Sequence, residues 1–293
     1  MCCFSKEVRH VSATRVFARA LEGDRQLLVY EMKLDADGDL AMVLPIPVPV
    51  SSPEETVRFV DMSSCKDFFP QLELLFPIEV LRGGFGVPQP AAFQAQARQL
   101  VVHDVSDFEA SFVPTVKDFD RLDPRFRMPS GVWDALPAYA DWGFCVFKLR
   151  APKGSAAPAP DAATAAADET SPGILDRVIN LFRPDAPVAP TATREFHPMA
   201  FEFPRRDATK LFFPTVHVHD GAVHAEARFD HTLYCQVGKD SRPPPTSWER
   251  SETTAGGEGS LLTTRSAMAW LDRDAYAHRL GIHGTAPNRD TWI

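Results

Sequence analysis

Four of the nine histidines in this 293-residue chain fall within residues 217–231. They lie in the segment LFFPTVHVHDGAVHAEARFDH as His217, His219, His224 and His231. Neutral imidazoles are common ligands of zinc, copper and iron, and three of them with an open fourth position form a typical catalytic zinc site. The spacing therefore points to the binding of a divalent transition metal ion.

The dipeptide Asp220-Gly221, between two runs of alternating apolar residues, predicts a two-residue β-hairpin. In that register His217 faces His224 across the hairpin, and His219 lies one pleat further along the same face. We therefore predict His217, His219 and His224 as metal ligands, with His231 on the opposite, core-facing side.

The same face of the predicted hairpin carries Glu226, a candidate ligand and the nearest candidate acid or base if the metal activates water or dioxygen. Asp220 is a second carboxylate that could bind or orient a ligand. A half-exposed strand face with hydrogen-bonded imidazoles explains the same pattern. A turn shifted by one residue would divide the histidines between two faces.

Cys2 is a second chemical candidate, because removal of Met1 would leave it as the N-terminal residue. An N-terminal cysteine can act as a nucleophile with its own α-amino group as the base. This interpretation predicts an amidohydrolase. Two alternatives stay open: Cys2 and Cys3 could be thiolate ligands that complete the histidine site, or ordinary small side chains.

The elements that would position these residues are mostly strands, and we expect an α+β fold with a predominantly antiparallel sheet and a few short helices. A Gly23-containing break predicts a hairpin between two strands. The alternating prolines of Ala41–Val50 favour an edge strand or a polyproline II segment. The expected elements are strands at Thr14–Ala20, Gln26–Leu34, Trp142–Leu149 and His197–Pro204, and a helix at Ser266–Leu280.

Residues 151–195 are rich in Ala and Pro, which is typical of a flexible insertion. The insertion would divide a single β-rich domain into residues 1–150 and 196–293. Within it, the apolar spacing from Ile174 to Phe182 predicts a short amphipathic helix at 173–183. A third hypothesis follows, in which the 174–182 helix recruits a protein partner and the chain has no catalytic role.

Composition narrows the classes of partner. The formal net charge is −8, which argues against binding to nucleic acid or to anionic membranes. The sequence contains no apolar run typical of a signal peptide or a transmembrane helix. Its five cysteines are odd in number and include no Cys-x-x-Cys pair, so we expect reduced thiols and a cytoplasmic protein.

Four segments together carry a family resemblance: MCCFS, TRVFARALEGDRQLLVYEM, AMVLPIPVP and LPAYADWGFCVFKL. The chain resembles a bacterial family of unassigned function whose members have a Cys-Gly-Gly-Phe-Phe-Cys start and a Val-Leu-Pro-x-Pro strand. The resemblance covers the first half of the chain and the strand after the insertion, and implies fold rather than chemistry. The opening Cys2-Cys3-Phe4-Ser5 departs from that family, because it lacks the double glycine, the second spaced cysteine and an exported leader.

Overall fold

The structure is a computed structural model that describes residues 2–76, 104–105, 108–129, 131–149, 194–238, 243–262 and 265–293. The predicted helix at 173–183 lies outside these residues, as does the predicted insertion apart from its last two residues. The described part contains two large β-sheets, a two-stranded sheet and short helices. No helix among these residues is long and apolar enough to span a membrane.

The six-stranded sheet has the order β12-β1-β4-β8-β7-β6. Its neighbours are antiparallel except for β1 and β12, which are parallel. The strands are β1 (Cys2–Phe4), β4 (Leu40–Ile46), β6 (Asp104–Val105), β7 (Phe108–Val113), β8 (Gly143–Leu149) and β12 (His217–Val218).

The eight-stranded sheet has the order β14-β15-β13-β2-β3-β10-β5, with β9 beside β3. Only β13 and β2 are parallel neighbours in it. Its strands are β2 (His10–Leu21), β3 (Arg25–Asp35), β5 (Arg58–Val60), β9 (Arg194–Glu195), β10 (Met199–Pro204), β13 (Glu226–Gln236), β14 (Glu249–Thr254) and β15 (Tyr276–Pro287).

The remaining elements are short. Strands β11 (Phe212–Phe213) and β16 (Thr291–Trp292) pair with each other. The helices are α1 (Phe68–Glu73), α3 (Arg265–Met268) and four 3₁₀ turns, η1 (Glu54–Thr56), η2 (Val116–Arg121), η3 (Pro124–Phe126) and η4 (Pro137–Tyr139). The protein is thus a β-rich α+β fold with mostly antiparallel strands, as the sequence predicts.

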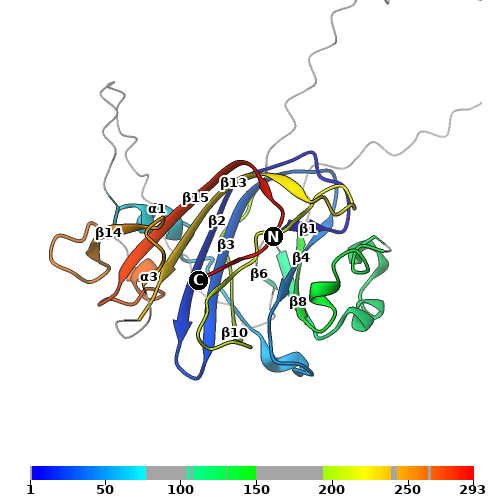
Figure 1. Cartoon of the computed structure of the whole chain (residues 1–293), viewed down its shortest axis with the longest axis horizontal. Coiled ribbons are helices and arrows are strands. Elements are labelled where there is room, and N and C mark those ends of the chain that lie inside the picture. The colour runs from blue at the N-terminus through cyan, green and yellow to red at the C-terminus, as the bar shows by residue number, and fades with distance from the viewer. Residues whose placement is uncertain are drawn as a thin grey trace, which may run out of the picture.

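The eight-stranded sheet is buried on both faces, because alternate side chains of its strands enter two different apolar clusters. On β2, Val16 belongs to the cluster shared with the six-stranded sheet, whereas Phe17 packs with α1 residues such as Phe68. Figure 1 shows β15, β13, β2 and β3 side by side, with β4 and β8 on one side of them and α1 and α3 on the other. The main core therefore lies between the two sheets.

The predicted N-terminal hairpin is confirmed, since β2 and β3 pair antiparallel up to Leu21 and Arg25. The prediction for Ala41–Val50 is wrong in placing the strand at an edge, because β4 lies between β1 and β8. Pro45 is tolerated there because β1 pairs only with Met42 and Val43, so β4 has a single partner strand at the proline.

The predicted helix at Ser266–Leu280 is also wrong. Helix α3 ends at Met268, and Tyr276 already begins β15. The side chain of Gln236 donates to the carbonyls of Asp272 and Ala275 and accepts from the Asp272 N–H. These tertiary bonds and the long ladder with β13 override the local helical pattern.

Candidate functional site

Three histidine rings meet where the two sheets face each other. His217 lies on β12 of the six-stranded sheet and His231 on β13 of the eight-stranded sheet. Their Nε2 atoms are 3.3 Å apart. The ring of His219 stacks on that of His217, with centroids 4.7 Å apart and planes inclined by 18°. The cluster thus joins the two layers of the fold.

The predicted hairpin register is wrong, because β12 pairs with β1 while β13 pairs with β15 and β2. The chain does turn at Gly221, whose φ of +78° favours glycine. However, no ladder forms between His217 and His224 within the described strands. The rule of alternating faces therefore does not extend from β12 to β13, and His231 can turn toward His217.

His224 pairs with a carboxylate of its own loop rather than with the other rings. Its Nε2 lies 2.8 Å from Asp220 Oδ2, and its side chain is 61% exposed. It still lines a surface hollow of about 250 Å³ together with His217, His219 and Glu226. The predicted residues thus share one hollow, although only His217 and His219 have rings in contact.

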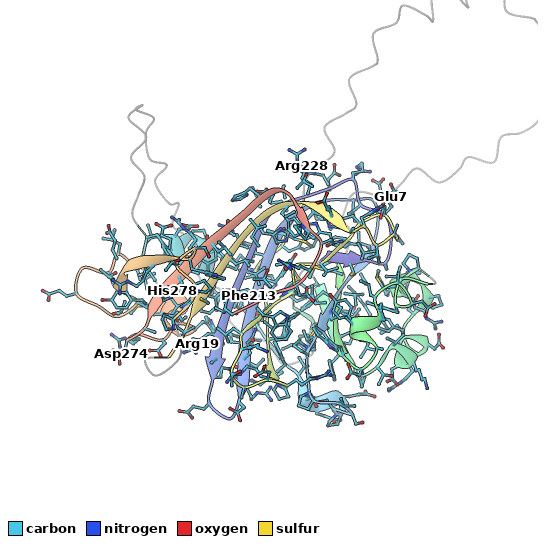
Figure 2. All side chains as sticks on the ribbon, viewed as in Figure 1. Glu7, Arg19, Phe213, Arg228, Asp274 and His278 are labelled. Carbon is cyan, nitrogen blue, oxygen red and sulfur yellow. The ribbon has the colours of Figure 1, made fainter. Side chains whose placement is uncertain are left out.

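This hollow opens at one end of the molecule. Its lining also includes Arg228 and Asn288, and Arg228 lies at the upper edge of the view in Figure 2. Glu226, the first residue of β13, is exposed there. The hollow therefore gives solvent and small molecules a route to the face of His217 and His219.

Burial keeps the three clustered imidazoles neutral. Desolvation lowers the pKa of His217 to about 3 and that of His219 to about 4. It lowers the pKa of His231 to about 2, and the neighbouring histidines add to this effect. Aromatic rings form part of the apolar surroundings, with Phe229 against His217 and Phe4 against His219. Neutral imidazoles keep the nitrogen lone pairs that bind a metal.

Two nitrogens of the cluster are buried without a hydrogen-bond partner among the described residues, His219 Nε2 and His231 Nδ1. A buried polar atom that lacks a partner carries a desolvation cost of about 1–3 kcal/mol. Such atoms are uncommon in folded proteins and call for a physical explanation. Both atoms belong to imidazole rings of the same cluster, where a bound metal ion or water would satisfy them.

The side chain of Asn288 holds His217 in place. Its Oδ1 accepts from the His217 N–H at 2.7 Å, and its Nδ2 donates to the His217 carbonyl at 2.9 Å. The same Nδ2 donates to the carbonyl of His224 at 3.0 Å. One amide therefore fixes both ends of the loop that carries the predicted ligands.

The parallel ladder of β1 and β12 places the backbone of Cys2 beside that of His217, and that of Cys3 beside Val218. The side chain of Cys2 lies outside the described part of the structure, whereas Cys3 is buried. Among the described residues, no three His, Cys, Asp or Glu side chains already surround a common point as metal ligands do. A metal centre here would require at least one ring to turn.

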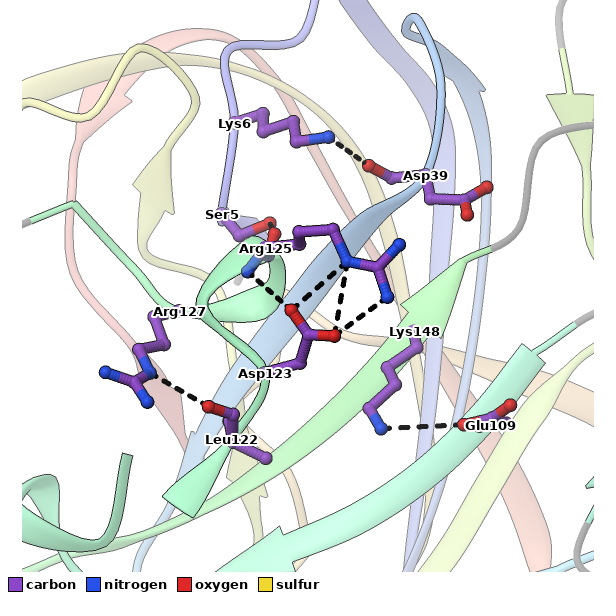
Figure 3. Close-up of polar contacts among 9 residues, drawn as sticks. All are labelled: Ser5, Lys6, Asp39, Glu109, Leu122, Asp123, Arg125, Arg127 and Lys148. Atoms are coloured by element: carbon purple, nitrogen blue, oxygen red, sulfur yellow. Dashed lines mark hydrogen bonds and ion pairs between the residues drawn. The ribbon is translucent and has the colours of Figure 1, made fainter. Parts of the chain in front are cut away.

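A second, larger hollow of about 430 Å³ is lined mostly by charged residues of β7, η3 and β8. In Figure 3, Arg125 binds both carboxylate oxygens of Asp123, and Lys148 reaches Glu109 at 3.5 Å. The guanidinium of Arg125 holds the pKa of Asp123 down to about 2. These charges pair with one another, and no buried polar atom among the hollow's described residues lacks a partner.

Sequence reasoning missed His231 and Asn288 as members of the site. His231 could have been found, because Phe229, His231, Leu233 and Cys235 form an alternating row that faces the core. Asn288 lies some seventy positions from His217 along the chain and carries no local signal. Asn288 contacts His217 only because the fold brings the segment after β15 next to β12.

No known protein family matches the chain, and no curated protein matches its sequence. Solved structures of baculovirus P35 align with it at low similarity. One crystal structure of P35 has 13% identity and a TM-score of 0.41, over 97% of this chain and 95% of that chain. A mutated P35 after caspase cleavage has 11% identity and a TM-score of 0.40, over 96% and 99%. These TM-scores are too low to establish a common fold.

Proposed function

We propose that this protein binds a divalent transition metal ion through His217, His219 and His231. The observation that carries the proposal is the 3.3 Å separation between Nε2 of His217 and Nε2 of His231. A tetrahedral zinc ion with Zn–N bonds of about 2.0–2.1 Å separates two ligand nitrogens by about 3.3–3.4 Å. The two rings therefore have the spacing that a shared metal ion requires.

His219 is the third ligand of the proposed centre. Its ring already stacks on His217, and its Nε2 has no hydrogen-bond partner among the described residues. Turning this ring toward the other two nitrogens would break no hydrogen bond of that atom. Binding would also satisfy a buried nitrogen whose isolation is unfavourable.

The low pKa values of the cluster favour the same function. A metal competes with protons for imidazole nitrogens, and histidines that stay neutral to low pH offer little competition. Nitrogen ligands suit zinc, copper and iron, so the donor set admits all three. His224 is outside this ligand set, because its side chain is 61% exposed and the histidine rings in contact with His217 among the described residues are those of His219 and His231.

The hollow that His217 and His219 line would supply the open coordination position that a catalytic metal needs. Glu226 lines this hollow and is the candidate acid or base for a metal-bound water. Cys2 is the additional ligand to test, since its backbone pairs with that of His217. Thiolates bind zinc and copper well, so replacing Cys2 would weaken metal binding further if its thiolate is a ligand.

Elemental analysis of tag-free protein tests the proposal. We expect about one equivalent of a transition metal after equilibration with zinc, and its loss in a His217→Ala/His231→Ala double variant. His278→Ala is the matched control, because His278 also has a buried, unpartnered Nδ1 but lies further along the sheet on β15. Less than about a tenth of an equivalent, or equal binding by the double variant, would refute the proposal.

A further inference from the structure

We infer that Asn288 is the positioning residue of this centre, a role that rests on the proposed function. Asn288 follows β15 directly and lies beside the hollow that His217 and His219 line. Its amide would set the affinity of the metal without touching the ion. Residues that orient a ligand from outside the coordination sphere typically change metal affinity by about 10–100-fold when they are replaced.

The side chain of Asn288 takes the place of a second neighbouring strand for β12. Strand β12 consists of His217 and Val218, and within the described residues its one neighbouring strand is β1. On His217, the side-chain amide of Asn288 makes the donor and acceptor bonds that a neighbouring peptide group would make. The backbone of the central ligand is therefore held by a side chain rather than by a long ladder.

The same amide also closes the loop that carries His217, His219 and His224. Its Nδ2 donates to both the His217 and the His224 carbonyl, so residues 217–224 are tied at their two ends. His219 lies within this loop, and it is the ring that has to turn. Fixing the loop ends limits the positions that the His219 ring can reach, which favours the arrangement that binds.

Asn288 is itself held in place by hydrogen bonds of its backbone and its side chain. Its backbone N–H donates to the Ala225 carbonyl at 2.9 Å, next to the pair formed by Glu226 and Pro287. Both donor hydrogens of the amide and its oxygen are then engaged by the loop. Aspartate would lose the two donors, and glutamine would hold the amide one methylene too far out.

The experiment measures zinc affinity by competition with a chelator in wild type, Asn288→Ala and Asn288→Gln. We expect affinity to fall about 10–100-fold in Asn288→Ala and less in Asn288→Gln, which keeps an amide and serves as the variant that folds if the first does not. Cobalt(II) spectra of the same proteins should change, because a displaced His217 alters the coordination geometry.

Gln26→Ala is the matched control. Gln26 makes the same pair of amide bonds, to the N–H and carbonyl of Phe212, at a place away from the histidines. Its loss should lower thermal stability and leave zinc affinity unchanged.

Zinc affinities of the Asn288 variants within about twofold of wild type would overturn the inference and leave the metal site standing. A wild-type protein that binds no zinc would instead remove the proposed function itself, and the inference with it.

Discussion

His217 and His231 bring their Nε2 atoms to 3.3 Å although they lie on strands of different sheets. Each is almost fully buried, with exposed fractions of 7% and 1%. A neutral pair at this distance can share one N–H···N hydrogen bond, but it leaves Nδ1 of His231 without a partner among the described residues. In the metal centre proposed above, an ion bound by both Nε2 atoms would take the place of this hydrogen bond.

Acid should destabilise the metal-free protein. Burial lowers the pKa of His217, His219 and His231, so the unfolded chain takes up protons at a higher pH than the folded one. Their contribution to stability is present above the unfolded pKa of about 6.5 and is lost as the pH falls toward the folded values. Denaturant unfolding of chelator-treated protein should therefore show lower stability near pH 4.5 than near pH 7.

The control for this pH dependence is His231→Phe, which removes one titrating ring and keeps its approximate shape. Burial raises the pKa of Asp290, which acts in the opposite direction as the pH rises above its ordinary value. The difference in the pH dependence of unfolding free energy between wild type and His231→Phe isolates the contribution of His231. Identical profiles of stability against pH for the two proteins would contradict the predicted contribution of His231.

The apo protein should tolerate His231→Phe. Phenylalanine fits the apolar row of Phe229, Leu233 and Cys235 and removes the unpartnered Nδ1 of His231, while Nε2 of His217 loses its contact with that ring. We expect thermal stability near pH 7 equal to wild type within about 1 kcal/mol, because the lost polar contact is offset by the removed desolvation cost. A loss of more than about 3 kcal/mol would mean that the ring has an essential structural role.

Asp290 should be the main anchor of the segment before His217. Its carboxylate accepts from Tyr139 Oη at 2.6 Å and from the N–H groups of Thr215 and Val216 at 2.9 and 3.2 Å. Asp290→Ala leaves these donors without partners and should cost about 2–4 kcal/mol of unfolding free energy. Asp274→Ala, at an exposed turn, should change it by less than about 0.5 kcal/mol.

Local signals predict part of this fold well. The break at Gly23, flanked by apolar runs, gives the hairpin of β2 and β3 with its correct turn. Strand β8 also agrees with the apolar pattern that predicts a strand at Trp142–Leu149. The helix expected over 266–280 fails because its second half finds a partner in β13, and a ladder that spans the chain cannot be read from a local period.

The candidate site, too, is predicted only in part from the sequence. Residue types and density indicate where the histidines gather, and two of the three predicted ligands, His217 and His219, do meet. The prediction of the third depends on a hairpin that does not form, since Asn288 and β1 take up the hydrogen bonds of β12. Contacts between segments far apart in the sequence therefore decide which third ring lies beside His217 and His219.

Calorimetric zinc titration of tag-free wild type, His231→Phe and His224→Ala is the decisive test of a zinc site that includes His231. We expect one tight site in wild type, its retention in His224→Ala and its loss in His231→Phe, because in the proposed centre His231 supplies a ligand nitrogen and His224 does not. Loss of binding in His224→Ala with full binding in His231→Phe would contradict the account, as would a wild-type protein that takes up no zinc.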